Sequence, residues 1–140
     1  MFEKIKGNKT FTKLMKRQNI NLSYAMVEPS DSWYNIISTI HNSLNEMKKL
    51  PHNEVEITSH DNLKLKGIYY PNPKKSSVTV ICLHGYASHP EKEMAFPGLF
   101  YLSQGYNVLI TYQRAHGLSQ GKFMSLGVLE QQDMIRWIDK

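Results

Sequence analysis

The chain has 140 residues, of which 41% are hydrophobic and 21% charged, and these proportions are ordinary for a globular domain. The first 17 residues carry six basic side chains and one acidic one, which accounts for the entire net charge of +5. The high pI therefore describes a tail, and we do not expect a nucleic-acid-binding domain.

Three absences point to a cytoplasmic location. No stretch approaches the ~20 apolar residues that a membrane span requires. The basic first residues are not followed by an apolar core, so we do not expect a secretory signal. The single cysteine, Cys82, cannot form an internal disulfide, which fits a reducing compartment.

Residues 1–30 are expected to form a basic N-terminal arm. Thr10 is suited to cap a short helix with Phe11, Leu14 and Met15 on one face and lysines on the other. Two interpretations stay open. A basic amphipathic stretch over residues 1–18 can lie on an anionic membrane surface, whereas most chain termini are solvated and partly frayed. We expect the solvated terminus.

A helix is predicted over residues 31–50. Ser30, Asp31 and Ser32 are typical of a helix start, and Pro51 disfavours continuation past Leu50. Apolar side chains at spacings of three and four form one stripe: Trp33, Ile36, Ile37, Ile40, Leu44 and Met47. The stripe predicts packing against the sheet that follows.

Strands follow in two patterns. Residues 54–58 and 63–70 alternate between apolar and polar side chains around a polar turn, which predicts an antiparallel hairpin with one wet face. Residues 78–83 and 106–112 are almost continuously apolar, which predicts strands buried on both faces, as at the centre of a parallel sheet.

Two further helices complete the pattern. One is expected over residues 94–104, where Gly105 ends it. The other is expected over residues 126–139, with Leu129, Met134, Trp137 and Ile138 facing inward. Strand, helix, strand and helix with these connection lengths predict parallel pairing and right-handed crossovers.

The strand over residues 78–83 runs directly into His84, Gly85 and Tyr86. Glycine lets the backbone bend sharply, so that the next amide can point away from the strand. Because ligands of open α/β sheets bind at the carboxyl ends of the strands, we expect a site at this turn.

This turn and the segments after it resemble the α/β-hydrolase family, in particular its bacterial serine hydrolases of esterase and peptidase type. The resemblance covers roughly residues 54–140 and rests on several motifs in order: 84–86, 105–110, 114–122, Gly127, Glu130, Asp133 and 137–138. It implies that the backbone N–H of Tyr86 is one donor of an oxyanion hole, while His84 and Gly85 shape the turn. It also implies a structural loop that contains Arg114, His116, Gly117 and Ser119.

The expected fold class is α/β. We expect an incomplete α/β-hydrolase sheet, with an N-terminal antiparallel hairpin followed by a parallel β-α-β-α unit, preceded by an N-terminal helical arm. The arm would be residues 1–30, and residues 31–140 would form the N-terminal half of the hydrolase domain. A complete α/β-hydrolase is usually about one and a half to two times as long, so the resemblance implies a chain that ends before the nucleophile, the acid and the base.

The segment from Gly117 to Gly121 matches the pattern G-x-S-x-G of a nucleophile elbow, but its context does not. An elbow serine lies directly between a buried strand and the helix that follows it. Ser119 lies seven residues beyond Tyr112, and no helical pattern begins until near Ser125. We therefore do not expect Ser119 to be a nucleophile. Ala115 stands where the family usually has glycine, which questions the shape of this loop wherever φ must be positive.

We expect neither a cofactor nor a bound metal. His84, His89 and His116 can lie at one edge of the sheet, but no cysteine or carboxylate pattern with ligand spacing accompanies them. Glu130 and Asp133 are expected to make loop contacts rather than to act as catalytic carboxylates.

The resemblance implies a serine hydrolase of carboxylic esters or peptides, inactive without a C-terminal half. A small ester or amide would be its substrate only once that half is supplied. The alternative is a non-catalytic module that binds or interacts through the half-pocket, the basic arm or an open sheet edge. In the family's strand order the strand over residues 78–83 would keep one unpaired edge, which favours self-association.

Overall fold

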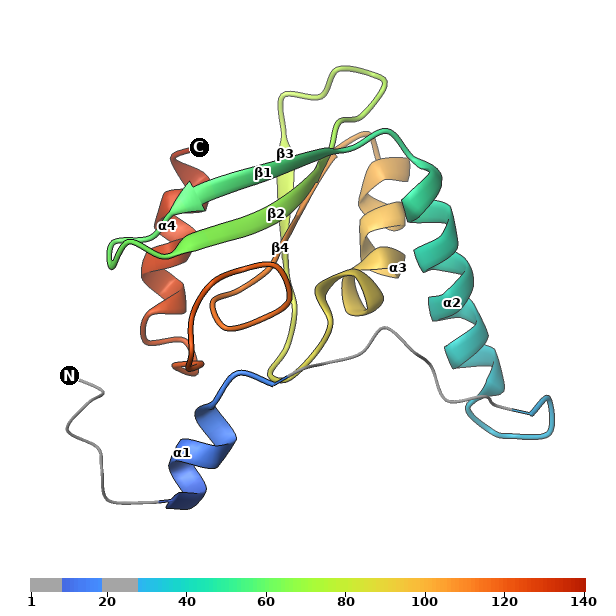
Figure 1. Cartoon of the computed structure of the whole chain (residues 1–140). Helices are drawn as coiled ribbons and strands as arrows, with labels where there is room; N and C mark the ends of the chain where they lie inside the picture. Colours follow the sequence, from blue (N-terminus) through green and yellow to red (C-terminus); the bar gives the residue numbers. More distant parts are fainter. Residues whose placement is uncertain (1–8, 19–27) are drawn as a thin grey trace.

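The computed structural model describes residues 9–18 and 28–140. Its centre is a four-stranded sheet in the order β1-β2-β4-β3. The strands are β1 (Asn53–Thr58), β2 (Lys64–Tyr70), β3 (Thr79–Leu83) and β4 (Asn107–Thr111). Helices α2 (Tyr34–Lys49) and α3 (Pro90–Ser103) cover one face, and α4 (Glu130–Ile138) lies on the other (Figure 1). A short helix, α1 (Lys9–Met15), lies near the end of β3 that leads into α3 (Figure 1).

The pairing of the strands confirms the predicted hairpin and the parallel unit. β1 and β2 pair antiparallel, with Val55 opposite Gly67. β2 continues antiparallel onto β4, while β3 and β4 pair in parallel, with Ile81 opposite Leu109. The predicted mixed sheet, an antiparallel hairpin joined to a parallel unit, is therefore present, because the crossover through α3 brings β4 back beside β3 in the same direction.

Two hydrophobic clusters fix the layers on the sheet. The cluster under α2 and α3 contains Leu44, Met47, Ile68, Tyr70, Cys82, Ala95, Val108, Ile110 and Tyr112. The smaller cluster under α4 contains Ile57, Leu65, Leu109 and Trp137. Successive residues of β4 alternate between these clusters, as the two-residue period of a strand requires, and all five residues of β4 are buried.

The prediction that β3 is buried on both faces is wrong. β3 is the outermost strand, and Cys82 is its one buried residue. Leu83 is 43% exposed. Among the strands that the structure describes, β3 pairs with β4 alone, so its second edge stays open.

The stripe on α2 is buried only at its C-terminal end. Leu44 and Met47 are buried, whereas Trp33 and Ile36 are 63% and 51% exposed. The helix packs mainly against α3 rather than on the sheet. Gly98 of α3 makes this possible, because a Cβ there would lie 3.1 Å from Cε of Met47. The helix also begins at Tyr34, three residues later than predicted.

The two later helices also differ from the prediction. α3 begins at Pro90 rather than near residue 94, because proline suits the first helical turn, where its missing N–H has no partner to lose. α4 begins at Glu130 rather than at residue 126. Leu126 and Gly127 have φ of +49° and +95°, which prevents helix formation there. Trp137 is buried as predicted, but Ile138 is 70% exposed.

The expectation of a solvated, frayed terminus is wrong for residues 9–18. Met15 is 5% exposed and packs with Ala115 and Met124. Lys16 forms an antiparallel bridge with Phe123, so that the N–H of Met124 donates to the carbonyl of Met15 at 2.7 Å. The helix begins at Lys9, and Thr10 lies inside it rather than at its cap. Residues 1–8 and 19–27 of the predicted arm lie outside the described residues.

No helix within residues 9–18 or 28–140 combines the length and the apolar character needed to cross a bilayer.

Candidate functional site

The turn after β3 is fixed by the buried side chain of His84. The imidazole is 3% exposed. Its Nε2 accepts a hydrogen bond from the N–H of Gln113 at 3.1 Å, so its Nδ1 carries the proton and donates to the carbonyl of Gly85 at 2.9 Å. The side-chain amide of Gln113 donates to the carbonyl of His84. Burial lowers the pKa of His84 to about 4, and its ring is therefore neutral near pH 7.

Glu93 holds the next residue of the turn. The N–H of Gly85 donates to Oε2 of Glu93 at 2.8 Å, and Glu93 lies in the first turn of α3. A Cβ at Gly85 would lie 3.3 Å from the other carboxylate oxygen, so glycine suits this close approach. The N–H of Tyr86 donates no hydrogen bond to a described residue. The hydroxyl of Tyr86 donates to the carbonyl of Leu14 at 2.5 Å.

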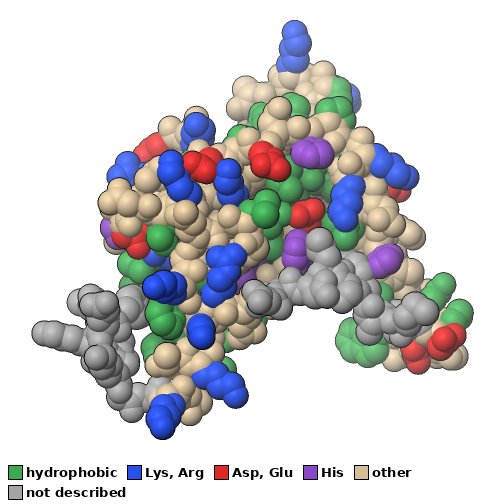
Figure 2. All heavy atoms as spheres, viewed as in Figure 1, with side chains coloured by type: hydrophobic (Ala, Val, Ile, Leu, Met, Phe, Trp, Pro, Cys, Tyr) green, Lys and Arg blue, Asp and Glu red, His purple; other side chains and the backbone are tan. Residues whose placement is uncertain are grey.

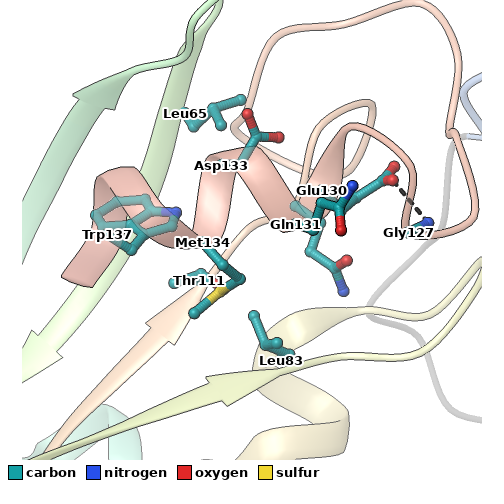
Figure 3. Close-up of a pocket in the computed structure, with 10 residues that line it drawn as sticks. Leu65, Leu83, Thr111, Gly127, Glu130, Gln131, Asp133, Met134 and Trp137 are labelled. Carbon is teal, nitrogen blue, oxygen red and sulfur yellow. Dashed lines mark hydrogen bonds between the residues drawn. The ribbon is translucent and has the colours of Figure 1, made fainter. Parts of the chain in front are cut away.

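A hollow of about 250 Å³ lies at the carboxyl ends of β3 and β4, beside this turn. Figure 3 shows Met134 of α4 next to Thr111 of β4, with Leu83 of β3 across from them. Leu65, Gln113, Gly127, Glu130, Gln131, Asp133 and Trp137 complete the lining. Leu83 directly precedes His84 and Gln113 bonds to it, and both line the hollow, so the hollow and the turn adjoin, although Tyr86 itself does not line the hollow.

Arg114 is the centre of a buried ion-pair network. Its guanidinium donates to Asp133 through Nε at 2.7 Å and Nη2 at 2.8 Å, and to Asp61 through Nη1 at 2.9 Å and Nη2 at 3.1 Å. Burial alone would lower the pKa of Arg114, but the hydrogen bonds to Asp133 and Asp61 outweigh it and the pKa is raised. The network ties the loop after β4 to α4 and to the turn between β1 and β2. His60, Asp61 and Asp133 have metal-binding spacing, but Arg114 already supplies a cation to both carboxylates.

The hydroxyl of Ser119 bonds only to backbone groups. It donates to the carbonyl of Tyr112 and accepts from the N–H of Lys66 at 2.8 Å. The side chain is 1% exposed. Gln120 adds two bonds to the backbone of Lys64. The serine therefore joins the loop to β2, with both its proton and a lone pair engaged.

The loop takes a left-handed conformation at Ala115 despite the missing glycine. Ala115 has φ of +61°, and it is fully buried against Met15 and Met124. A non-glycine residue in this region costs about 1–2 kcal/mol, and burial of the methyl group offsets part of that strain. Gly117 has φ of +44°, and a Cβ there would lie 2.4 Å from the ring of Tyr112.

The three histidines that the sequence places near one edge do not form one cluster. His84 and His116 lie edge to face with ring centroids 4.4 Å apart, whereas His89 lies against Tyr112 at 6.3 Å. Nδ1 of His116 bonds to the carbonyl of Arg114 at 3.0 Å. Its Nε2 is buried without a partner among the described residues. Burial lowers the pKa of both His116 and His89.

Three residues that organise the site were not predicted from sequence. Gln113 and Glu93 hold the turn, and Asp61 completes the arginine network. The position of Glu93 was only weakly indicated by the sequence, since carboxylates favour the first turn of a helix. The sequence did not indicate the roles of Gln113 and Asp61, because their partners His84 and Arg114 lie 29 and 53 residues away in the chain.

No known family model matches the sequence, and no curated protein matches it. Solved structures do match. An esterase from Pyrococcus furiosus is 30% identical with a TM-score of 0.63, over 91% of this chain and 40% of the esterase chain. Another crystal form of that esterase gives 32% identity and a TM-score of 0.58, over 84% and 41%.

A more distant structure carries information on the fold alone. An alpha-beta hydrolase from Vibrio vulnificus is 17% identical with a TM-score of 0.53, over 89% of this chain and 47% of that one. The chain thus spans less than half the length of the solved proteins that it matches.

Proposed function

We propose that this chain, which has the fold of the N-terminal half of an α/β-hydrolase, supplies the oxyanion-side half of an esterase active site. The observation that carries the proposal is the turn at residues 84–86. Two side chains from distant elements hold it, and the N–H of Tyr86 has no acceptor among the described residues. The likeness to an esterase supports the reaction class, although that esterase is covered over only 40% of its length.

The proposed role follows from what ester hydrolysis requires. The developing negative charge on the carbonyl oxygen is stabilised by N–H groups that are fixed before the reaction starts, and removing one such donor costs about 3 kcal/mol. His84 and Gly85 fix the direction of the Tyr86 amide through Gln113 and Glu93. The neighbouring hollow has mainly apolar lining, which suits the carbon chain of an ester.

The nucleophile is not proposed to come from Ser119. That hydroxyl is buried and bonded to two backbone groups, so we assign Ser119, with Arg114, His116 and Gly117, to holding the loop. A catalytic serine needs a base within hydrogen-bond reach. Among the described residues His116 does not bond to Ser119, because its Nδ1 bonds to the carbonyl of Arg114 and its Nε2 has no partner. The 140 residues by themselves are therefore proposed to be inactive. We also propose a cytoplasmic location, which the buried free thiol of Cys82 supports.

The test joins the chain to the C-terminal portion of the P. furiosus esterase that it does not cover. We expect the fusion to hydrolyse a chromogenic short-chain ester. Tyr86→Pro, which removes the N–H, should lower kcat about 10²–10³-fold. Tyr86→Phe keeps the N–H and should stay within a few-fold of the parent fusion.

The same experiment includes the 140-residue chain alone, which should neither hydrolyse the ester nor react with a fluorophosphonate probe. Labelling that Ser119→Ala abolishes would contradict the proposal. Equal rates for the Tyr86→Pro and Tyr86→Phe fusions would contradict the role of the turn.

A second candidate function is non-catalytic interaction through the open edge of β3. The strand carries no charge and no proline, whereas β1, at the other edge of the sheet, carries Glu54 and Glu56. Charges on an edge strand oppose pairing with another chain, and β3 lacks this protection. A hollow of about 510 Å³ also lies beside β3, lined in part by Thr79, Ile81 and Trp137.

This candidate predicts self-association of the chain. Thr79→Lys, at an exposed position of β3, should shift the sedimentation of concentrated protein towards the monomer. Thr58→Lys, at an exposed position of β1, is the matched control and should leave sedimentation unchanged. A chain that is monomeric at all concentrations would rule out pairing through β3.

A further inference from the structure

One surface beside the turn combines exposed lysines with exposed apolar side chains. It joins α1 to the loop over residues 117–126, and we call it the α1 surface. Its exposed side chains are Lys9, Phe11, Lys13, Leu14, Lys16, Leu118, Lys122 and Phe123. Figure 2 shows Lys and Arg side chains gathered over this region with hydrophobic side chains among them.

The two halves of the α1 surface are fixed to each other. The guanidinium of Arg17 donates to the carbonyl of Ser119 at 2.6 Å and to that of Gly117, on either side of Leu118. The N–H of Arg17 donates to the carbonyl of Lys122 at 2.8 Å, next to the bridge between Lys16 and Phe123. A seven-residue helix is marginal in isolation, so this attachment is what orders α1 on the body.

The α1 surface has an unbalanced positive charge. Residues 9–18 and 113–128 contain no aspartate or glutamate. The ion pairs formed by described residues involve other cations, and none involves Lys9, Lys13, Lys16 or Lys122. These lysines are exposed, and their charge is open to a partner of opposite sign.

Its apolar side chains point to the kind of partner. Leu14, Leu118 and Phe123 are 53%, 56% and 44% exposed. Lysines around exposed leucine and phenylalanine form the pattern of a helix that lies in a bilayer interface, where apolar groups enter the acyl boundary and cations meet anionic headgroups. Nucleic acid needs the charge but not the leucines, because its binding relies on phosphate contacts and base stacking.

We propose that the α1 surface binds the anionic face of a lipid bilayer. The contact from the Tyr86 hydroxyl to the Leu14 carbonyl links α1 to the turn at residues 84–86. Binding would therefore hold that turn next to the membrane. The proposal does not depend on hydrolase activity, since it rests on charge, exposure and the attachment of α1 alone.

The size of the effect can be bounded. Each lysine near an anionic bilayer strengthens binding about five-fold, so the loss of two lysines should weaken it about thirty-fold. Removing two apolar anchors should weaken binding as well, since buried apolar area adds to the electrostatic attraction.

The test is cosedimentation of the full chain with vesicles. We expect binding to phosphatidylcholine vesicles that contain phosphatidylserine, weakening as salt is raised, and little binding to phosphatidylcholine alone. Lys13→Gln with Lys122→Gln should reduce the partition coefficient about thirty-fold. Lys74→Gln with Lys75→Gln is the matched control in an exposed loop at the opposite end of β3 (Figure 1), and it should leave binding close to wild type.

A second pair of variants separates a bilayer from a general polyanion. Leu14→Ser with Phe123→Ser should weaken vesicle binding, while Ile36→Ser with Ile135→Ser, at positions 51% and 59% exposed, should not. Three results would overturn the proposal: no preference for phosphatidylserine, equal loss in the control pairs, or vesicle binding that ignores the apolar variants and is matched by a short DNA duplex. Circular dichroism of each variant confirms that the comparison is between folded chains.

Discussion

Arg114→Met is expected to lower the free energy of unfolding by about 3–5 kcal/mol, because it leaves the buried carboxylate of Asp133 without its partner. Arg114 and Asp133 are 2% and 4% exposed, and two hydrogen bonds join them. The coupling also spans the fold, since Arg114 reaches Asp61 in the turn between β1 and β2. Urea denaturation followed by circular dichroism measures the change.

Two further variants show whether the loss of stability in Arg114→Met comes from an unpaired buried charge. Lys66→Met removes one partner of Glu56, at 3.0 Å, and should leave the free energy of unfolding almost unchanged because surface ion pairs contribute little. Arg114→Met combined with Asp133→Leu should recover part of the stability, since no unpaired charge stays buried. An Arg114→Met chain as stable as Lys66→Met would show that the network is not a stabilising element.

The same network should make stability depend on pH in the acid range. The hydrogen bond from Arg114 lowers the pKa of Asp61 to about 2, below the ordinary value of about 3.9. The folded-state pKa is the lower one, so the stabilisation is fully present above pH ~4 and is lost as pH falls towards 2. Asp61→Asn should be less stable than wild type at neutral pH, and the gap should narrow across this window.

The elements that were predicted well are those whose pattern depends on local chemistry. β1 alternates because only one of its faces is covered, so its period is visible in the sequence. The predicted wet face does not extend along β2, which buries Leu65 under α4 and Ile68 and Tyr70 on the opposite face.

The turn at residues 84–86 was also locatable, since an apolar strand that runs straight into His-Gly, without a charged residue between, marks a sharp bend. One of its hydrogen bonds is local, from Nδ1 of His84 to the carbonyl of Gly85, whereas Gln113 and Glu93, which also hold it, come from other elements.

Failures arose where the outcome depends on the neighbours of a segment. β3 and β4 have the same continuous apolar pattern, yet all five residues of β4 are buried and only Cys82 of β3 is. The open edge of β3 was expected, but from the strand order that the resemblance implies and not from the pattern. A continuous apolar pattern does not indicate how many strands and helices pack around a strand, and so it does not predict how far the strand is buried. In the same way α1 looks amphipathic in isolation, but the residues that receive it, Ala115 and Met124, lie about a hundred positions away.

Gly121→Ala is expected to destabilise the chain by about 3–5 kcal/mol, because the cost of backbone strain and the cost of a steric clash add together. Gly121 has φ of +119°, where other residues are strained. A Cβ at this position would lie 2.8 Å from the backbone N of Ala115. That atom cannot retreat, because it donates to the carbonyl of Gln120 at 2.9 Å and closes the loop.

Gly105→Ala separates the strain from the clash. Gly105 has φ of +92°, and a Cβ there would meet nothing within 4 Å, so the variant should lose only the strain, about 1–3 kcal/mol. The loop closed at Gly121 begins at Gln113, whose N–H binds His84. Hydrogen exchange at the Gln113 amide should therefore accelerate in Gly121→Ala beyond the loss of global stability, and not in Gly105→Ala. Equal unfolding free energies for the two variants would mean that the loop adapts to the methyl group, and that the turn at residues 84–86 does not depend on how tightly this loop closes.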